Sequence, residues 1–131
     1  MSKIKFIVIQ PNTIKIDGEF DHIIVPGVDG DFGISEDHTP FITKIRSGIL
    51  KTYKNSRKEQ YAIHDGFVTV ENNKVTVICD VIESTVEIDR NRAEQSKERA
   101  EKRLKSNKED VDFRRAESAL KRSLVRLSLT K

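Results

Sequence analysis

The distribution of glycine and proline along the chain divides it into two regions. All 6 glycines and all 3 prolines of the 131 residues occur at or before Gly66. Both residue types mark turns and weaken helix interiors, so the first region is predicted to be rich in turns and the last third to be helical. We therefore expect a β + α protein with two domains, residues 1–86 and residues 87–131.

The first region has the pattern of short strands separated by turns. Its segments are β-branched or alternate between apolar and polar residues, and Asn, Asp, Gly and Pro lie between them. The clearest hairpin is "FVTVENNKVTVI", in which Asn72 and Asn73 tolerate the positive φ of a tight turn. Many short strands predict a sandwich or a barrel. The expected strands are 3–10, 13–16, 22–26, 40–45, 48–53, 60–71 and 74–80.

The second region predicts two helices. Asp89 is a suitable N-cap for a first helix that ends near Lys105. A second helix is capped by Asp110 or Asp112 and ends near Leu129. A short connection between two helices favours an antiparallel hairpin. The predicted apolar seams are Ala93, Ala100 and Leu104 in the first helix, and Phe113, Ala116, Leu120, Leu124 and Leu127 in the second.

Arginines recur in both predicted helices. Residues 92–104 resemble residues 115–127, and in each helix three arginines share one stripe. The antiparallel arrangement predicts that Arg92 lies near Arg122 and Arg126, at the same end as Asp89. The two stripes are Arg92, Arg99 and Arg103, and Arg115, Arg122 and Arg126.

Three interpretations of these arginines remain open at this point. The net charge of +3 combines −2 over residues 1–86 with +5 over residues 87–131. The arginines can solvate an exposed hairpin and pair with Glu94, Glu98, Glu101 and Glu117, dock on an acidic partner, or hold the phosphates of a nucleotide. The alternative function is a free-standing β-sandwich module whose basic hairpin binds nucleic acid. Phe113 is the hairpin's one aromatic residue and lies on the predicted seam, so stacking on bases is disfavoured and we expect no nucleic-acid partner.

The acidic, glycine-rich segment 25–41 is the obvious place to search for chemistry. It fails as a calcium loop, because Pro40 stands where the bidentate glutamate is needed, and its glycines have the spacing neither of a dinucleotide fingerprint nor of a P-loop. His38 beside Asp37 has no nucleophile near it in the sequence. We interpret the segment as scaffold turns, and we expect no catalytic residues and no metal site.

Cysteine usage and hydropathy suit a reducing compartment. The single Cys79 lies in a strand-like run and is expected to be a small buried hydrophobe. The apolar run at positions 6–9 is too short for a secretory signal, and no run approaches the ~20 residues of a membrane span.

Three segments carry a resemblance to a known family. They are "VPGVDGDFGISEDHTPFITKIRSGIL" (25–50), "HDGFVTVENNKVTVICD" (64–80) and "EIDRNRAEQSKERAEKRL" (87–104). In these segments, and in order over essentially its whole length, the chain resembles the epsilon subunit of bacterial and chloroplast F-type ATP synthase. It departs from the family at "SED" (35–37), where many members have Leu-Pro-Gly or Leu-Pro-Asn, and we expect this to alter a loop.

The resemblance implies a ten-stranded β-sandwich followed by an antiparallel two-helix hairpin. It also implies a non-catalytic subunit on the central stalk of a proton-translocating synthase, which contacts the gamma subunit and the ring of membrane subunits. Such a subunit lies at the cytoplasmic face of the cell membrane and is attached to it only through the complex. His38 belongs to the segment that would take part in the rotor contact.

The resemblance also implies that the hairpin regulates the synthase. In bacterial relatives it can fold down in a compact form against the sandwich, or extend toward the catalytic subunits. In the extended form it inhibits ATP hydrolysis, with its arginines on an acidic loop of the beta subunit. The expected contact residues here are Arg99, Arg103, Arg114, Arg115 and Arg122.

Some family members bind ATP as a regulatory ligand, while no cofactor is required. They use an Ile-Asp-x-x-Arg-Ala motif and an arginine pair on the second helix. The matching residues of this chain are Ile88, Asp89, Arg92, Ala93, Arg122 and Arg126.

Overall fold

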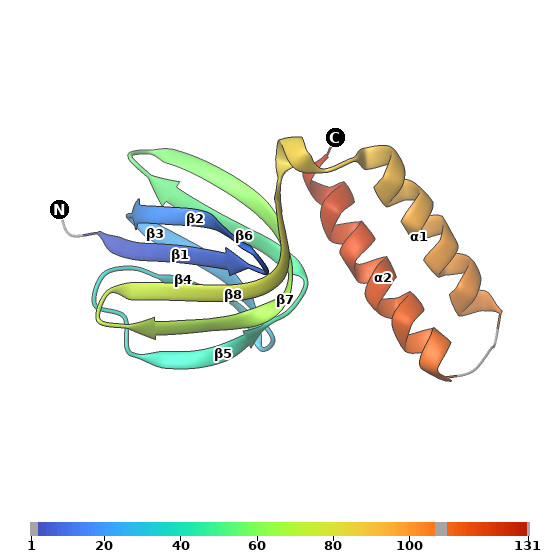
Figure 1. Cartoon of the computed structure of the whole chain (residues 1–131), viewed down its shortest axis with the longest axis horizontal. Helices are drawn as coiled ribbons and strands as arrows, with labels where there is room; N and C mark the ends of the chain where they lie inside the picture. The colour runs from blue at the N-terminus through green and yellow to red at the C-terminus, as the bar shows by residue number, and fades with distance from the viewer. Residues whose placement is uncertain (1–2, 107–109, 131) are drawn as a thin grey trace. The chain divides into compact units, whose positions relative to one another are not determined.

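The computed structural model of the chain describes residues 3–106 and 110–130 (Figure 1). It divides into two compact units, Met1–Glu83 and Ser84–Lys131. The first unit is built from strands and the second from helices. Among the described residues, no helix is long and apolar enough to span a membrane.

The first unit is a β-sandwich of eight strands. The hydrogen-bonded order is β2-β1-β8-β7-β5-β3-β4, with β6 paired to β3 and β7. β1 and β8 run parallel, and the other pairs with a determined register run antiparallel. The strands are β1 (Ile4–Gln10), β2 (Thr13–Phe20), β3 (His22–Gly27), β4 (Gly30–Ile34), β5 (Phe41–Ile45), β6 (Gly48–Lys54), β7 (Arg57–Glu71) and β8 (Lys74–Ser84).

The predicted sandwich is confirmed, but the expected count of ten strands is wrong. Part of the difference comes from β7, which is one continuous strand of 15 residues. Its first half pairs with β6, from Arg57 to Ile63, and its second half pairs with β5, from Gly66 to Val70. The strand bends between the two halves, where Asp65 has a φ of +52°. One long bent strand therefore stands in place of two shorter ones, which accounts for one strand of the difference between ten and eight.

The core follows from the alternation that the sequence shows. On β1, Ile4, Phe6 and Val8 are buried with 0–1% of their surface exposed, while Lys5 between them is exposed. On β8, Val75 and Val77 point inward in the same way. Burial of one such side chain contributes roughly 1.5–3 kcal/mol, so these inward rows supply most of the stabilisation of the β unit.

The segment 25–41 is more regular than the turns that we predicted for it. β3 and β4 form a tight hairpin across this segment, with Gly27 opposite Gly30. Arg46 closes it from β5's end, because its guanidinium donates to the carbonyl oxygen of Gly27 at 2.7 Å and to Asp31 Oδ1 at 2.6 Å. The prediction missed β4 because its glycines masked the pairing of Phe32 with Val25 and the burial of Ile34.

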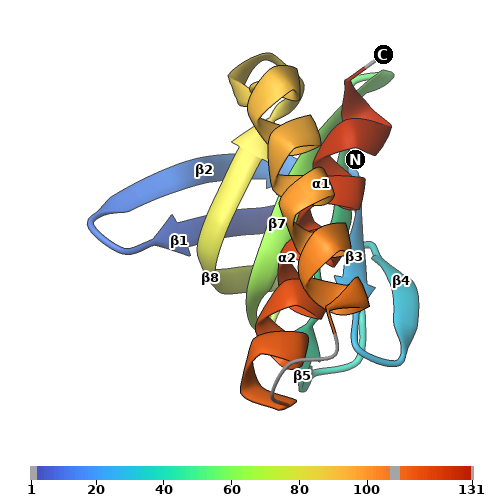
Figure 2. The same cartoon turned by 90° about the vertical axis from the view of Figure 1, so that its right-hand side faces the viewer.

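The second unit begins with a short 3-10 helix, η1 (Thr85–Glu87), and continues with two α-helices, α1 (Arg90–Lys105) and α2 (Asp110–Leu129). Figure 1 shows α1 and α2 side by side along their lengths, and in Figure 2 α1 lies in front of α2. Both predicted helices are confirmed. α2 begins at Asp110, and the choice between Asp110 and Asp112 as its cap lies outside the described residues, because the side chains there are not described.

Small side chains dominate the buried positions of the helices. Ala93, Ala100 and Ala116 are 3%, 2% and 0% exposed. Phe113 and Leu124, which we predicted for the apolar seam, keep 49% and 47% of their surface exposed. Helix packing on alanines allows close approach but buries little apolar area, so the hairpin has a weak apolar core.

We predict that Gly66→Ala destabilises the β unit by roughly 2–4 kcal/mol. A Cβ at this position would collide with the carbonyl oxygen of Ile78 and lie 2.9 Å from Cα of Cys79, and backbone cannot move aside as a flexible side chain can. Urea unfolding measures the change. Gly18→Ala is the control, because its nearest neighbour would be Phe20 Cε1 at an ordinary 3.5 Å. Equal stabilities of the two variants would contradict the assigned close approach.

Cys79 gives the β unit a predicted sensitivity to high pH. Burial, assisted by the charge of Asp80, raises the pKa of the Cys79 thiol from its ordinary value of 9.0 to about 11. The folded state therefore keeps a proton that the unfolded state loses, so this contribution is complete below pH 9 and is lost as the pH rises to 11.

The free energy of unfolding should fall across this range by at most about 3 kcal/mol more in the wild type than in Cys79→Ala. Urea unfolding at several pH values from 8 to 11 measures both chains, and the variant removes the effect of other titrating groups. Parallel curves would show that the thiol ionises equally in both states.

Candidate functional site

The start of α1 is fixed by Asp89. Its backbone is extended, and its Oδ1 accepts a hydrogen bond from the backbone N–H of Arg92 at 3.1 Å. Its carbonyl oxygen accepts from the N–H of Ala93 at 3.0 Å. The predicted N-cap is confirmed, and one carboxylate oxygen of Asp89 is used by the helix itself.

Arg90, which the sequence analysis did not single out, joins the two helices at this end of the hairpin. Nη1 of Arg90 donates to the carbonyl oxygen of Thr130 at 2.6 Å, and Nε donates to Glu94 Oε1 at 3.2 Å. The first bond connects the start of α1 to the end of α2, which confirms the antiparallel hairpin. A signal was present in the sequence, because Arg90 and Glu94 have the i,i+4 spacing of a helical ion pair.

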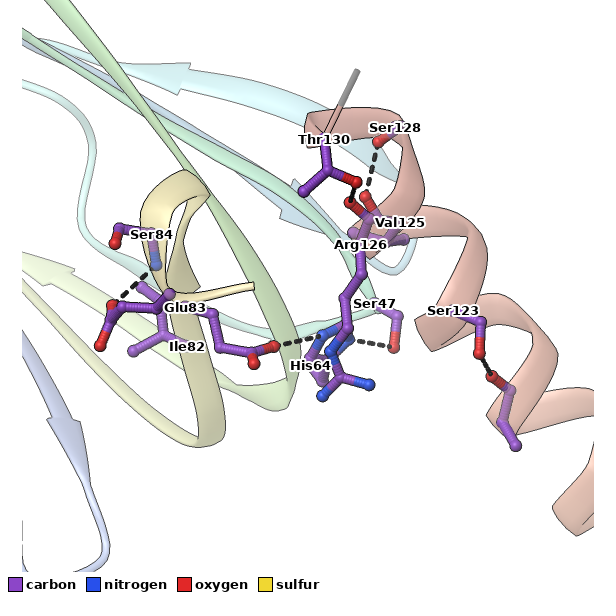
Figure 3. Close-up of polar contacts among 12 residues, drawn as sticks. Ser47, His64, Ile82, Glu83, Ser84, Ser123, Val125, Arg126, Ser128 and Thr130 are labelled. Atoms are coloured by element: carbon purple, nitrogen blue, oxygen red, sulfur yellow. Dashed lines mark hydrogen bonds and ion pairs between the residues drawn. The ribbon is translucent and has the colours of Figure 1, made fainter. Parts of the chain in front are cut away.

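The last turns of α2 are closed by their own hydroxyl groups, as Figure 3 shows. Thr130 Oγ1 donates to the carbonyl oxygen of Arg126 at 3.5 Å, and Ser128 Oγ donates to that of Val125 at 2.6 Å. Arg126 thus lies one turn before Thr130, the residue that Arg90 contacts. The structure therefore brings the cap of α1 and the last turns of α2 to one end of the hairpin.

The six residues with the nucleotide-binding pattern differ in exposure. Ile88 and Ala93 are buried, with 8% and 3% of their surface exposed. Arg92 is exposed, while Arg122 and Arg126 are half-buried. The polar members are thus more accessible than the apolar ones at this end of the hairpin.

The arginines expected to meet a partner are mostly exposed. Arg99, Arg103, Arg114 and Arg115 are exposed, and Arg122 is half-buried. Two of the four glutamates that one interpretation paired with the arginine stripes meet other cations, since Glu94 meets Arg90 at 3.2 Å and Glu117 meets Lys121 at 3.9 Å. Within the described part of the chain, none of the five arginines takes part in an ion pair.

His38 lies in the loop between β4 and β5. Its Nδ1 is 2.8 Å from the carbonyl oxygen of Thr39, and its ring centroid is 5.1 Å from that of Phe41. Asp37 turns instead toward the β7–β8 hairpin, where its backbone N–H donates to Asn73 Oδ1 at 2.7 Å. These contacts give His38 a role in holding the loop.

His64 forms the most deeply buried polar contact in the β unit (Figure 3). It is 1% exposed, its Nδ1 lies 3.3 Å from Ser47 Oγ, and its Nε2 lies 3.8 Å from Glu83 Oε1. The sequence analysis did not single out His64. Among the described residues, no group of three His, Cys, Asp or Glu side chains is placed to hold a metal ion.

Comparison with known proteins extends the geometry to function. The family model "ATP synthase, Delta/Epsilon chain, beta-sandwich domain" matches residues 3–85, and "ATP synthase, Delta/Epsilon chain, long alpha-helix domain" matches residues 87–131. The chain is 38% identical to the ATP synthase epsilon chain of Symbiobacterium thermophilum, over 97% of this chain and 92% of that one. It is 40% identical to the epsilon chain of Desulfitobacterium hafniense strain Y51, over 91% and 88%.

Solved structures have the same fold. A chain of the Euglena gracilis mitochondrial ATP synthase (OSCP/F1/c-ring) matches with a TM-score of 0.84 at 22% identity, covering 96% of this chain and 79% of that one. A chain of the Tetrahymena thermophila mitochondrial ATP synthase (central stalk/c-ring) matches with a TM-score of 0.71 at 15% identity, covering 99% and 98%. Since the two family models together span both structural units, the chain belongs to the ATP synthase delta/epsilon chain family.

Proposed function

We propose that the chain is a non-catalytic subunit of the central stalk of a bacterial-type, proton-translocating ATP synthase, and that its helical hairpin regulates ATP hydrolysis. The observation that carries the proposal is the match of both units, sandwich and hairpin, to the two domains of one family. The proposed location is the cytoplasmic face of the cell membrane, where the chain is held through the complex.

The sandwich is the proposed rotor-binding unit, with the gamma subunit and the c-ring as partners. Its outer face carries exposed apolar side chains on neighbouring strands, and contiguous apolar surface of this kind is typical of protein contacts. Ile14 pairs with Ile9, and Ile9 pairs with Ile78, so apolar residues follow one another across three neighbouring strands. Ile14 and Ile78 are each 59% exposed. We place His38 in the same rotor contact, since its loop adjoins β5.

The hairpin is the proposed regulatory unit, with the catalytic beta and alpha subunits as partners. Guanidinium groups that have no carboxylate partner within the chain keep their charge-assisted hydrogen bonds available for an acidic surface. Arg99, Arg103, Arg114, Arg115 and Arg122 meet this condition among the described residues.

We predict that Arg103→Gln with Arg115→Gln relieves inhibition of ATP hydrolysis severalfold. The measurement is the ATPase rate of a synthase that lacks this chain, titrated with purified wild-type or variant chain at two salt concentrations. The matched control is Lys102→Gln with Lys121→Gln, because it removes the same charge from exposed positions of the same helices. An equal effect of both pairs of substitutions would show that only the net charge of the hairpin matters. If neither pair changed the ATPase rate, docking through the two arginine stripes would be ruled out.

We further propose that the helical hairpin binds ATP as a regulatory ligand at its base end, where the start of α1 meets the last turns of α2. Arg122 and Arg126 would hold the phosphates as paired forks, Arg92 would add charge, and Asp89 would accept from the base while its other oxygen caps α1. Ile88 and Ala93 would offer apolar contact to the base. A ligand bound only to the compact hairpin favours that state by about 2.7 kcal/mol at a hundredfold excess over Kd.

We predict that Arg122→Ala with Arg126→Ala abolishes ATP binding in calorimetry of the full chain, and also changes its inhibition of hydrolysis. Asp89→Asn is a second variant, which keeps the helix cap and removes the charge of the side chain. Asp89→Ala would in addition lose about 1 kcal/mol of capping. Circular dichroism confirms that each variant keeps its helices. If the double arginine variant leaves both binding and inhibition unchanged, the nucleotide proposal is wrong.

A further inference from the structure

A pocket of about 370 Å³ opens in the β unit beside the β6–β7 hairpin. All of its lining residues belong to the sandwich, and none of the arginines of the helical hairpin is among them. We propose that this pocket binds a small organic monoanion that carries one flat apolar ring. Its lining residues are Phe20, Thr52, Lys54, Asn55, Arg57, Glu59 and Tyr61.

The register of the hairpin explains why these side chains face the same way. Thr52 pairs with Glu59, and Lys54 pairs with Arg57. Directly opposed residues of an antiparallel pair lie on one face, and alternate residues along each strand share that face. The hairpin therefore presents its buried end at Thr52 and its two cations at the tip, on the side that Phe20 covers from β2.

The floor of the pocket is part of the core and is rigid. Thr52 is 2% exposed, and the ring of Phe20 packs edge-on against the fully buried Phe6 with 5.8 Å between centroids. A pocket with a preformed aromatic floor loses little entropy when a flat ring enters it.

The tip of the hairpin is also fixed. Asn55 and Ser56 have φ values of +49° and +68°, as a two-residue hairpin turn requires. The N–H of Asn55 donates to Asp21 Oδ2 at 2.9 Å, and its side chain accepts from Lys3 Nζ at 3.0 Å. The backbone of this turn, which carries Lys54 and Arg57 on either side, is therefore fixed at the mouth of the pocket.

The charges of the lining select the ligand. Nζ of Lys54 lies 5.4 Å from the ring centroid of Phe20, so a cation and an aromatic face adjoin each other. Glu59 accepts a hydrogen bond from the hydroxyl of Tyr61 at 2.8 Å. The charged lining residues are thus two cations, Lys54 and Arg57, and one carboxylate, Glu59. One excess positive charge suits a monoanion.

The volume selects size in the same way. At about 370 Å³ the pocket is at the lower end of the roughly 300–1,000 Å³ of small-molecule sites, so it suits one ring and one acidic group. The apolar part of such a ligand would lie on Phe20 and Tyr61, and its carboxylate would meet Lys54 and Arg57.

The test is a titration of the isotope-labelled full chain with benzoate, followed by amide NMR shifts, with acetate at equal ionic strength as the reference. We expect saturable shifts confined to β2 and the β6–β7 hairpin with benzoate and not with acetate. Lys54→Gln and Arg57→Gln should each weaken binding at least fivefold. The matched control is Lys58→Gln, which removes the same charge next to Arg57 but lies on the opposite face, paired with Tyr53.

Two outcomes would overturn the inference. Shifts that do not saturate, or that acetate reproduces, would show that the pocket has no site for the ring. Equal weakening by Lys58→Gln would show that only surface charge matters. Neither outcome bears on the role of the chain in the synthase, because the ATPase titration uses other residues.

Discussion

The bend of β7 at Asp65 and Gly66 is the constraint on which the β unit depends. It lets one strand hydrogen-bond to β6 in one layer and to β5 in the other, so the two layers are joined by continuous backbone. The bend requires a residue without a side chain at Gly66, because the backbone of Ile78 and Cys79 on β8 lies against it. The first half of β7 pairs with β6, and the pocket lies beside that hairpin.

Alternation of apolar and polar residues predicted most of the strands, because each layer of the sandwich has one solvent-exposed face and one buried face. It failed where glycine replaced the alternating side chains, as in β4, and it undercounted the length of β2, whose second half, "DGEF", lacks the pattern. The helices were predicted to within a residue at Lys105 and Leu129, because the cap at Asp89 and the absence of glycine and proline are local signals. Which helix residues would be buried was predicted less well, since exposure of Phe113 and Leu124 depends on packing that no local pattern records.

The candidate site shows the same division between local and tertiary information. The cap at Asp89 and the grouping of arginines into stripes follow from spacing along a helix. Which arginine would join the two helices does not, because the carbonyl oxygen of Thr130 is available to Arg90 only after the chain has turned back 40 residues later. Glu94 was expected to pair with the stripes, yet it pairs with Arg90, so local competition for one carboxylate decided which cations remain available to a partner.

The weak core of the hairpin is itself an argument for a regulatory role. Its buried positions are largely alanine, so helix contact contributes far less than the rows of isoleucine and valine contribute to the sandwich. The smaller the free energy that favours a compact form, the smaller the differential affinity with which a ligand can shift it. Two hydrogen-bonded contacts lie at the base end of the hairpin, the Asp89 cap of α1 and the bond from Arg90 to the carbonyl oxygen of Thr130. A ligand at that end would add to bonds that already hold the helices together, whereas an acidic partner along the exposed arginines would displace no ion pair among the described residues. The two proposed kinds of partner would therefore act on different parts of one hairpin, as a switch between two states requires.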